Sequence, residues 1–270
     1  MNYQSINVSH LLRKITFDDV LFNGAYTLDV YQNCAFGCRY CDSSYDKTIY
    51  IKKNAIETFK DEIKTCEKGR IVVGSVHDPY QPIEQKEELT RGILHIIEEL
   101  DIPVHILTKS PLIIRDLDIL TRLNDVRVTI TILSTDTSIV KLFEENAPTP
   151  QDRFETIKEL SNNDITTGIA LIPILPYLTE SFLEEIVSMA SQCDASYLIY
   201  KYLELKGDQK HIIFSLLDSI DKNLLPRYEK LYHESYSPSQ GYMRTMNKII
   251  ESTCKRYNLF TYTVPTINSR

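Results

Sequence analysis

Short apolar segments alternate with amphipathic segments along most of this 270-residue chain. Short runs that are rich in Val, Ile, Thr or Tyr are typical of strands buried on both faces of a parallel sheet. The strands that we predict are Tyr26–Tyr31, Ile71–Ser75, Val104–Thr108, Val126–Leu133, Ile165–Ile172 and Ser196–Leu203. The helices that we predict between them are Lys52–Lys68, Lys86–Leu100, Pro111–Leu123, Gln151–Asn162 and Thr179–Ser191.

Six strand–helix units in series predict an α/β fold with a parallel sheet. A closed barrel needs eight units, so we predict an open, partial (βα)6 TIM-like barrel with parallel strands. The barrel and its N-terminal lead-in are expected to occupy residues 1–205. Residues 206–270 are predicted to form a mostly helical extension packed on the same domain, with breaks at Pro226 and Pro238 and an extended piece near Phe260–Val264.

Composition and charge predict a globular, cytoplasmic protein. Apolar residues make up 43% of the chain and charged residues 25%, which is enough to build a full core. The polar N-terminus does not resemble a signal peptide, and no membrane span is expected because the most apolar run is short and contains Pro173. The net charge of −7 disfavours a strongly basic nucleic-acid-binding surface.

Three cysteines, Cys34, Cys38 and Cys41, follow the first predicted strand with the spacing C-x3-C-x2-C. Thiols clustered in this way in a reducing compartment are typical of metal ligands rather than disulfides. Three thiolates can bind three irons of a [4Fe–4S] cluster and leave the fourth iron open, as catalysis at the cluster requires. The alternatives are structural zinc in a non-catalytic scaffold or sensor, a redox dithiol, or thiols that are simply buried.

The cysteine spacing, with the aromatic Tyr40 before the third cysteine, resembles the radical S-adenosylmethionine (SAM) superfamily. The resemblance implies that SAM chelates the open iron through its amino and carboxylate groups. It also implies that one electron from the reduced cluster cleaves SAM to methionine and a 5′-deoxyadenosyl radical, which abstracts hydrogen from a substrate. A reductant such as flavodoxin or ferredoxin would supply the electron. Phe36 and Tyr40 are expected to cover the cluster and limit its contact with water.

Further segments resemble the spore photoproduct lyase-like branch of that superfamily, over roughly residues 24 to 203. They are GSVHDPYQPIE (74–84), LTR (89–91), ILTKS (106–110), IIRDLDIL (113–120) and NAPTPQDRFETIKEL (146–160). Gly74 and Ser75, at the end of the second strand, leave room for SAM and can bind its amino group. The resemblance places Lys109 against the SAM carboxylate and Thr131 against the SAM ribose or carboxylate.

The loop after the second strand carries polar side chains over the expected cavity. Those that we expect to face SAM or the substrate are Asp78, Tyr80 and Gln81. His77 is expected to be a hydrogen-bonded loop histidine, with acid–base chemistry as the alternative. Arg115 and Asp116 are expected to form a structural ion pair.

The sequence departs from the spore photoproduct lyase pattern at two positions. In that enzyme a cysteine just past the second strand and a tyrosine directly after the last cluster cysteine are thought to return hydrogen to the substrate. Here the two positions hold Val76 and Asp42. Neither side chain donates a hydrogen atom as a thiol or phenol does, so thymine-dimer reversal by that route is not expected. A nucleic-acid lesion or modified base stays an alternative substrate that only the resemblance supports.

Overall fold

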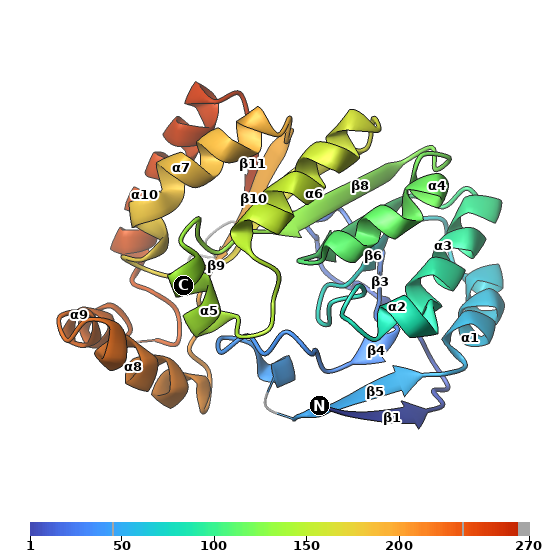
Figure 1. Cartoon of the computed structure of the whole chain (residues 1–270), viewed down its shortest axis with the longest axis horizontal. Coiled ribbons are helices and arrows are strands. Elements are labelled where there is room, and N and C mark those ends of the chain that lie inside the picture. Colours follow the sequence, from blue (N-terminus) through green and yellow to red (C-terminus); the bar gives the residue numbers. More distant parts are fainter. Residues whose placement is uncertain (45, 234, 264–270) are drawn as a thin grey trace.

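The structure, a computed structural model, describes residues 1–44, 46–233 and 235–263. Its main element is a curved eight-stranded sheet in the order β11-β10-β9-β8-β7-β6-β3-β2 (Figure 1). Neighbouring strands from β3 to β11 are parallel, whereas β2 runs antiparallel to β3. The strands are β2 (Leu12–Lys14), β3 (Tyr26–Leu28), β6 (Ile71–Val73), β7 (Val104–Thr108), β8 (Val126–Thr131), β9 (Thr166–Ile174), β10 (Tyr197–Tyr202) and β11 (Phe260–Thr263).

The predicted partial barrel is confirmed. The six predicted strands are present as β3, β6, β7, β8, β9 and β10, in chain order across the sheet. The sheet stays open, because its edge strands β2 and β11 do not pair with each other within the described part of the chain. β11 adds a further parallel strand beside β10, where the sequence indicated only an extended piece. Val264, the predicted end of that piece, lies outside the described residues.

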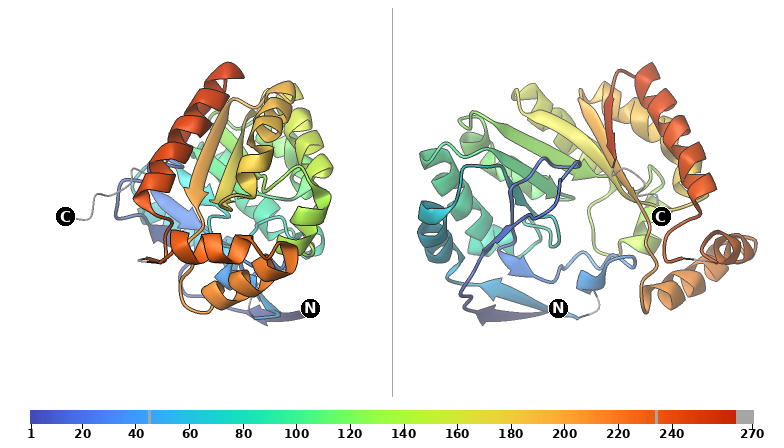
Figure 2. Two further views of the ribbon diagram at one scale, coloured as in Figure 1. Left: turned by 90° about the vertical axis from the view of Figure 1, so that its left-hand side faces the viewer. Right: turned by 180° about the vertical axis from the view of Figure 1, so that it is seen from behind.

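Helices cover the outer face of the curved sheet (Figures 1 and 2). Ile93 of α3, Ile157 of α6 and Ile250 of α10 are fully buried in the core between these helices and the strands. The helices before residue 205 are α1 (Ala55–Glu62), α2 (Glu84–Glu87), α3 (Leu89–Glu99), α4 (Leu117–Leu120), α5 (Thr137–Phe143), α6 (Pro150–Asn162) and α7 (Thr179–Gln192). Within the described ranges, no helix is both long enough and apolar enough to cross a bilayer.

Alternation along the strands decides which side chains reach the inside of the barrel. Val128 and Ile130 of β8 are fully buried in the core beneath the helices. Because successive side chains of a strand point to opposite faces, Thr129 and Thr131 point into the barrel. There the Thr129 hydroxyl lies 2.7 Å from the Tyr197 hydroxyl of β10. The inner face of β8 therefore carries hydroxyl groups, whereas its outer face carries the apolar side chains of Val128 and Ile130.

A second, three-stranded sheet, which the sequence did not predict, lies beside the barrel in the order β1-β5-β4 (Figure 1). Its strands are β1 (Asn2–Ile6), β4 (Tyr31–Gln32) and β5 (Thr48–Lys52). The predicted helix Lys52–Lys68 is therefore wrong at its start, and α1 begins only at Ala55. β5 is rich in β-branched residues and pairs with β1 and β4, which favours a strand over a helical turn.

Two further helices differ from their predicted form. The predicted helix Lys86–Leu100 is divided into α2 and α3 by Glu88, whose φ of +49° is left-handed. The predicted helix Pro111–Leu123 starts as the 3-10 helix Pro111–Asp116 and continues only briefly as α4. The short helix α5, which Asp136 caps through its side chain, was not predicted.

The chain after residue 205 contains α8 (Gln209–Ile220), α9 (Leu224–Leu231) and α10 (Gln240–Arg256). The predicted break at Pro226 is wrong, because this proline lies in the first turn of α9, where an N–H has no helical acceptor. Tyr228 of α9 is fully buried in a second core with Leu133 and Phe143, and its hydroxyl donates to Pro176 O (2.8 Å). The division of the chain near residue 205 stays a prediction.

We expect Thr149→Ala to lower the free energy of unfolding by about 1 kcal/mol, because Thr149 and Asp152 form a capping box at the start of α6. Urea unfolding of the purified variant measures the loss. Ser239→Ala is the matched control, since Ser239 is the N-cap of α10 and makes no side-chain cap hydrogen bond. Equal losses in the two variants would contradict the assignment.

Candidate active site

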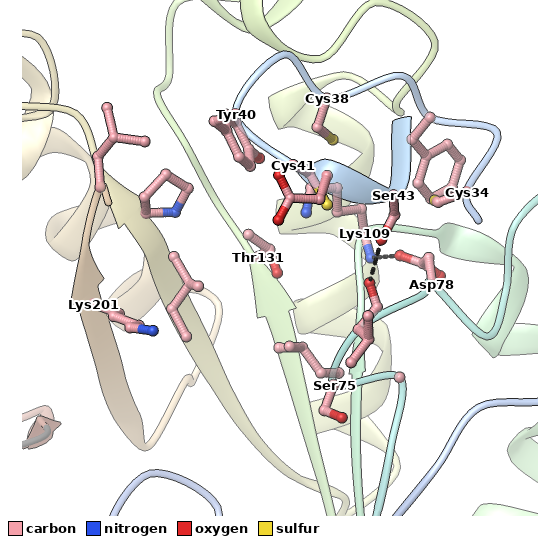
Figure 3. A pocket seen from close by; sticks show the side chains of 18 of the residues that line it. Cys34, Cys38, Tyr40, Cys41, Ser43, Ser75, Asp78, Lys109, Thr131 and Lys201 are labelled. Atoms are coloured by element: carbon pink, nitrogen blue, oxygen red, sulfur yellow. Dashed lines mark hydrogen bonds between the residues drawn. The ribbon is translucent and has the colours of Figure 1, made fainter. Parts of the chain in front are cut away.

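A cavity of about 420 Å³ lies at the carboxyl ends of the barrel strands (Figure 3). This volume is typical of small-molecule sites. All nine predicted site residues line the cavity: Cys34, Phe36, Cys38, Tyr40, Cys41, Gly74, Ser75, Lys109 and Thr131. The fold therefore brings the loop that carries Cys34, Cys38 and Cys41, called the cysteine loop below, together with the ends of β6, β7 and β8.

One side of the cysteine loop is fixed by Gln81, which is fully buried. Its amide oxygen accepts a hydrogen bond from Ala35 N (3.0 Å), and its amide nitrogen donates to Asn33 O (3.1 Å). Gly37, with a φ of +67°, supplies the left-handed turn inside the loop. The prediction that Gln81 faces SAM or the substrate is therefore wrong, because both ends of its side chain bind the loop backbone.

The other side of the cysteine loop packs on the segment that follows α5. Arg39 N donates to Phe143 O (2.7 Å), and Asn146 N donates to Phe36 O (3.0 Å). The backbone of the loop is therefore held on one side by the Gln81 side chain and on the other by backbone groups of Phe143 and Asn146. The loop is thus preorganised before a metal arrives.

Burial makes the thiolate forms of Cys34 and Cys38 costly without a metal. It raises the pKa of Cys34 to about 12, with a smaller contribution from the nearby Asp78 carboxylate. It also raises the pKa of Cys38, although Lys109 opposes the shift. A metal cation stabilises a buried thiolate and forces its deprotonation, so this set of donors fits a metal cluster.

The described residues contain no group of three His, Cys, Asp or Glu side chains that could hold a single metal ion. A four-iron cluster binds each thiolate through a different iron and therefore takes sulfur atoms that are farther apart. The described lining of the cavity adds no fourth Cys or His to the three thiols, whereas a structural zinc site takes four such ligands.

Gly74 and Ser75 form the floor of the cavity at the end of β6. Gly74 has a φ of +85°, and a Cβ atom there would lie 2.4 Å from Leu107 O and 2.5 Å from a carbon of Pro79. Only glycine fits this close approach. The Ser75 hydroxyl is buried and has no hydrogen-bond partner among the described residues, so it offers a polar contact to a ligand in the cavity.

Asp78 joins the loop after β6 to the end of β7. Its carboxylate accepts hydrogen bonds from the Thr108 hydroxyl (2.6 Å) and from Lys109 N (2.8 Å), as Figure 3 shows. Burial raises the pKa of Asp78, whereas these bonds and the Lys109 charge act to lower it. Asp78 lines the cavity as predicted, and its bonds fix the backbone from which the Lys109 side chain starts.

A buried carboxylate that the sequence analysis missed, Glu144, lies behind the cavity wall. It accepts hydrogen bonds from the Tyr40 hydroxyl and from the Arg153 guanidinium, and its Oε1 lies 3.8 Å from Lys109 Nζ. Burial alone would raise the pKa of Glu144, but Arg153 and Lys109 outweigh it and hold this pKa below its usual value. The Glu144 side chain is therefore an anion. It lies two residues before the 146–160 segment, and nothing in its local sequence distinguishes it from the exposed Glu145.

A family model described as the radical SAM superfamily matches residues 28–190, more than half of the chain. The chain belongs to the radical SAM superfamily. Membership implies use of SAM and a [4Fe–4S] cluster, for which the cavity offers the ligands described above. The motifs of the sequence and the geometry of the site therefore agree with the family.

Relatives of this radical SAM protein include proteins described as uncharacterized. Rv2578c of Mycobacterium tuberculosis is 24% identical over 278 residues, which cover 91% of this chain and 82% of the relative. MJ0683 of Methanocaldococcus jannaschii is 27% identical over 246 residues, which cover 86% of each protein.

Solved structures share the fold of this radical SAM protein. Spore photoproduct lyase complexed with dinucleoside spore photoproduct matches with a TM-score of 0.67 and 14% identity, over 97% of this chain and 82% of the other. SuiB of Streptococcus suis bound to precursor peptide SuiA matches with a TM-score of 0.57 and 13% identity, over 88% of this chain and 48% of the other. At these identities the likeness is one of fold.

Other residues of the predicted loop serve the scaffold of the radical SAM site. Tyr80 is fully buried and donates to Asp116 (3.0 Å), so the prediction that it faces the cavity is wrong. His77 does not line the cavity. Its backbone N–H donates to Asp29 (3.1 Å), whereas its ring Nδ1 is buried and has no hydrogen-bond partner among the described residues, contrary to the predicted hydrogen-bonded histidine. The predicted ion pair of Arg115 with Asp116 is confirmed at 2.8 Å.

The wall opposite the cysteines comes from β10 and the chain that follows it, and the sequence analysis did not identify it. Lys201 points into the cavity from β10 in Figure 3, and Tyr202, Glu204 and Lys206 line the cavity beside it. Glu204 pairs with both lysines, at 3.6 Å from Lys201 and 2.7 Å from Lys206. This wall therefore adds charged groups at the end of the cavity away from the thiols.

We expect Gly74→Ala to lower the free energy of unfolding by about 2–4 kcal/mol, because it adds both a strained φ and a clash with Leu107 O. Gly207→Ala is the matched control: Gly207 has a φ of +54°, but nothing lies within 4 Å of an added Cβ. The control should lose only about 1–2 kcal/mol, the cost of a left-handed side-chain residue. Chemical denaturation of both variants makes the comparison, and equal losses would argue against the close approach at Gly74.

Proposed function

We propose that this radical SAM protein is an enzyme that abstracts a hydrogen atom from carbon of its substrate. Cys34, Cys38 and Cys41 would hold a [4Fe–4S] cluster, and SAM would bind in the same cavity. The observation that carries the proposal is that the three thiols and all the expected SAM contacts line one cavity at the strand ends. When bound, the reduced cluster and SAM supply the 5′-deoxyadenosyl radical that starts the reaction.

Each residue of the cavity has a separate task in this proposal. The Ser75 hydroxyl, which is buried without a partner among the described residues, would accept a hydrogen bond from the SAM amino group. Lys109 would pair with the SAM carboxylate as a point charge, and Thr131 would bind the ribose or carboxylate. Phe36 and Tyr40 would shield the metal from water.

The second half of the reaction would differ from that of spore photoproduct lyase. Val76 and Asp42, at the positions of that enzyme's expected hydrogen donors, both line the cavity. Val76 is 56% exposed and has no transferable hydrogen of thiol type, and Asp42 accepts a hydrogen bond from Gln209 (2.7 Å). The proposed enzyme therefore ends its reaction by another route. A one-electron donor such as flavodoxin or ferredoxin would start it.

We expect the anaerobically reconstituted protein, reduced with dithionite, to convert SAM to 5′-deoxyadenosine. Alanine variants of Cys34, Cys38 and Cys41 should each lose the product, because each removes one iron ligand. Chromatography measures 5′-deoxyadenosine, and iron and sulfide analysis measures the cluster.

Cys193→Ala is the matched control, since Cys193 lies just past the end of α7 and does not line the cavity. It should keep both the cluster and the product. A reducible cluster in the unaltered protein that yields no 5′-deoxyadenosine would contradict the proposed function. A zinc-only protein without iron would instead favour the non-catalytic scaffold.

A further inference from the structure

Glu144 links the cysteine loop to the strand that carries Lys109. We infer that Glu144 is the positioning residue of the cofactor site, which aligns Lys109 and Tyr40 with SAM and the cluster. The inference rests on the proposed function. It assigns a role to a side chain that lies outside the metal ligands and outside the expected SAM contacts.

On the cluster side, Glu144 contacts the loop through both backbone and side chain. Its backbone forms an isolated antiparallel bridge with Cys38. Its carboxylate accepts a hydrogen bond from the hydroxyl of Tyr40, the residue directly before the third cysteine. A fully buried anion thus fixes the Tyr40 ring in the cavity wall.

On the SAM side, Glu144 attracts Lys109 without using the hydrogen-bonding capacity of its ammonium group. The 3.8 Å between Oε1 and Nζ is an ion-pair distance but is too long for a hydrogen bond. The three N–H donors of the Lys109 ammonium group therefore make no hydrogen bond to Glu144. The charge of Glu144 still restricts where the ammonium group lies. Lys109 lines the cavity.

Arg153 completes the arrangement from α6. Its guanidinium donates to Glu144, to Thr131 O (2.9 Å) and to Pro148 O (2.8 and 3.0 Å). These bonds direct the Arg153 charge toward the protein interior and neutralise Glu144 from behind. Lys109, and not Arg153, is thus the cation presented to a carboxylate in the cavity.

The sign of the effect on SAM binding separates positioning from a simple charge effect. A carboxylate that acted only through its charge would repel the SAM carboxylate, so its removal would tighten SAM binding. If the Glu144 carboxylate holds Lys109 in place, its removal would weaken SAM binding. Lys109 would then turn toward other anions nearby, such as the thiolates. Positioning therefore predicts weaker binding in a variant that is less negative.

The test is SAM affinity of Glu144→Gln after anaerobic cluster reconstitution. Equilibrium dialysis with labelled SAM gives the dissociation constant, and the change that SAM causes in the electron paramagnetic resonance signal of the reduced cluster gives an independent titration. We expect the dissociation constant to rise at least about tenfold while iron content stays that of the unaltered protein. Unchanged or tighter SAM binding would overturn the inference.

Glu84→Gln is the matched control. Glu84 is also fully buried and also accepts hydrogen bonds from a tyrosine and an arginine, Tyr31 and Arg115, but it does not line the cavity. This control should bind SAM as the unaltered protein does. Equally weakened SAM binding in both variants would mean that the Glu144 substitution acts through a general loosening of the fold. That result would overturn the inference.

Glu144→Asp is the second variant, needed if Glu144→Gln does not fold. It keeps the charge but withdraws the carboxylate by about 1.5 Å, one C–C bond. SAM affinity should again fall, and normal affinity would overturn the inference.

A double-mutant cycle tests whether Glu144 acts through Lys109. Lys109→Met should weaken SAM binding by itself, and adding Glu144→Gln should then weaken it little further. Fully additive losses would contradict the assignment. The proposed function fails separately, namely if the unaltered protein with its cluster neither binds nor cleaves SAM.

Discussion

The structure depends on holding a loop of three thiols rigidly while supplying no fourth ligand. Gln81 binds the loop from one side and the segment Phe143–Asn146 binds it from the other, in both cases through backbone groups of the loop. Backbone anchoring leaves the three thiols available for the cavity. It explains why a polar residue as large as Gln81 is fully buried although it touches no ligand site.

The same constraint accounts for the charges buried around the cavity. Glu144 and Arg153 are almost completely inaccessible to solvent, which is costly unless each charge is paired and hydrogen-bonded. Here the pair is satisfied by Tyr40 and by backbone carbonyls, so the cost is offset in the folded state. Of the two cations near Glu144, Lys109 is the one that lines the cavity, and Asp78 fixes the backbone from which it projects. The charges thus form one connected arrangement from α6 to the cysteine loop.

Much of this site could be predicted from sequence because its residues follow strands. Lys109 and Thr131 lie at the ends of β7 and β8, and the alternation of buried apolar residues locates those ends within a few residues. Parallel strands end at one edge, so the meeting of these residues with the cysteine loop followed from the fold class. The cysteines were predicted as metal ligands from their spacing alone.

What the sequence did not predict depends on contacts between distant segments. β5 is a strand because β1 and β4 pair with it, and neither partner is visible in its local pattern. Glu144 differs from its exposed neighbour Glu145 only in what the fold places around it. Tyr80 and Gln81 were assigned to the cavity from their loop, whereas their side chains turn into the protein to bind Asp116 and the cysteine loop.

One wall of the cavity comes from outside the residues that the family model matches. The family model matches residues 28–190, and the wall of Lys201, Glu204 and Lys206 lies beyond it. Gln209, at the start of α8, joins this wall to the cysteine loop by donating to Tyr40 O (3.0 Å) and to Asp42 (2.7 Å). Asp42 therefore docks the C-terminal helices where spore photoproduct lyase is expected to carry a tyrosine. The residue at the position of that tyrosine thus also fixes this wall of the cavity.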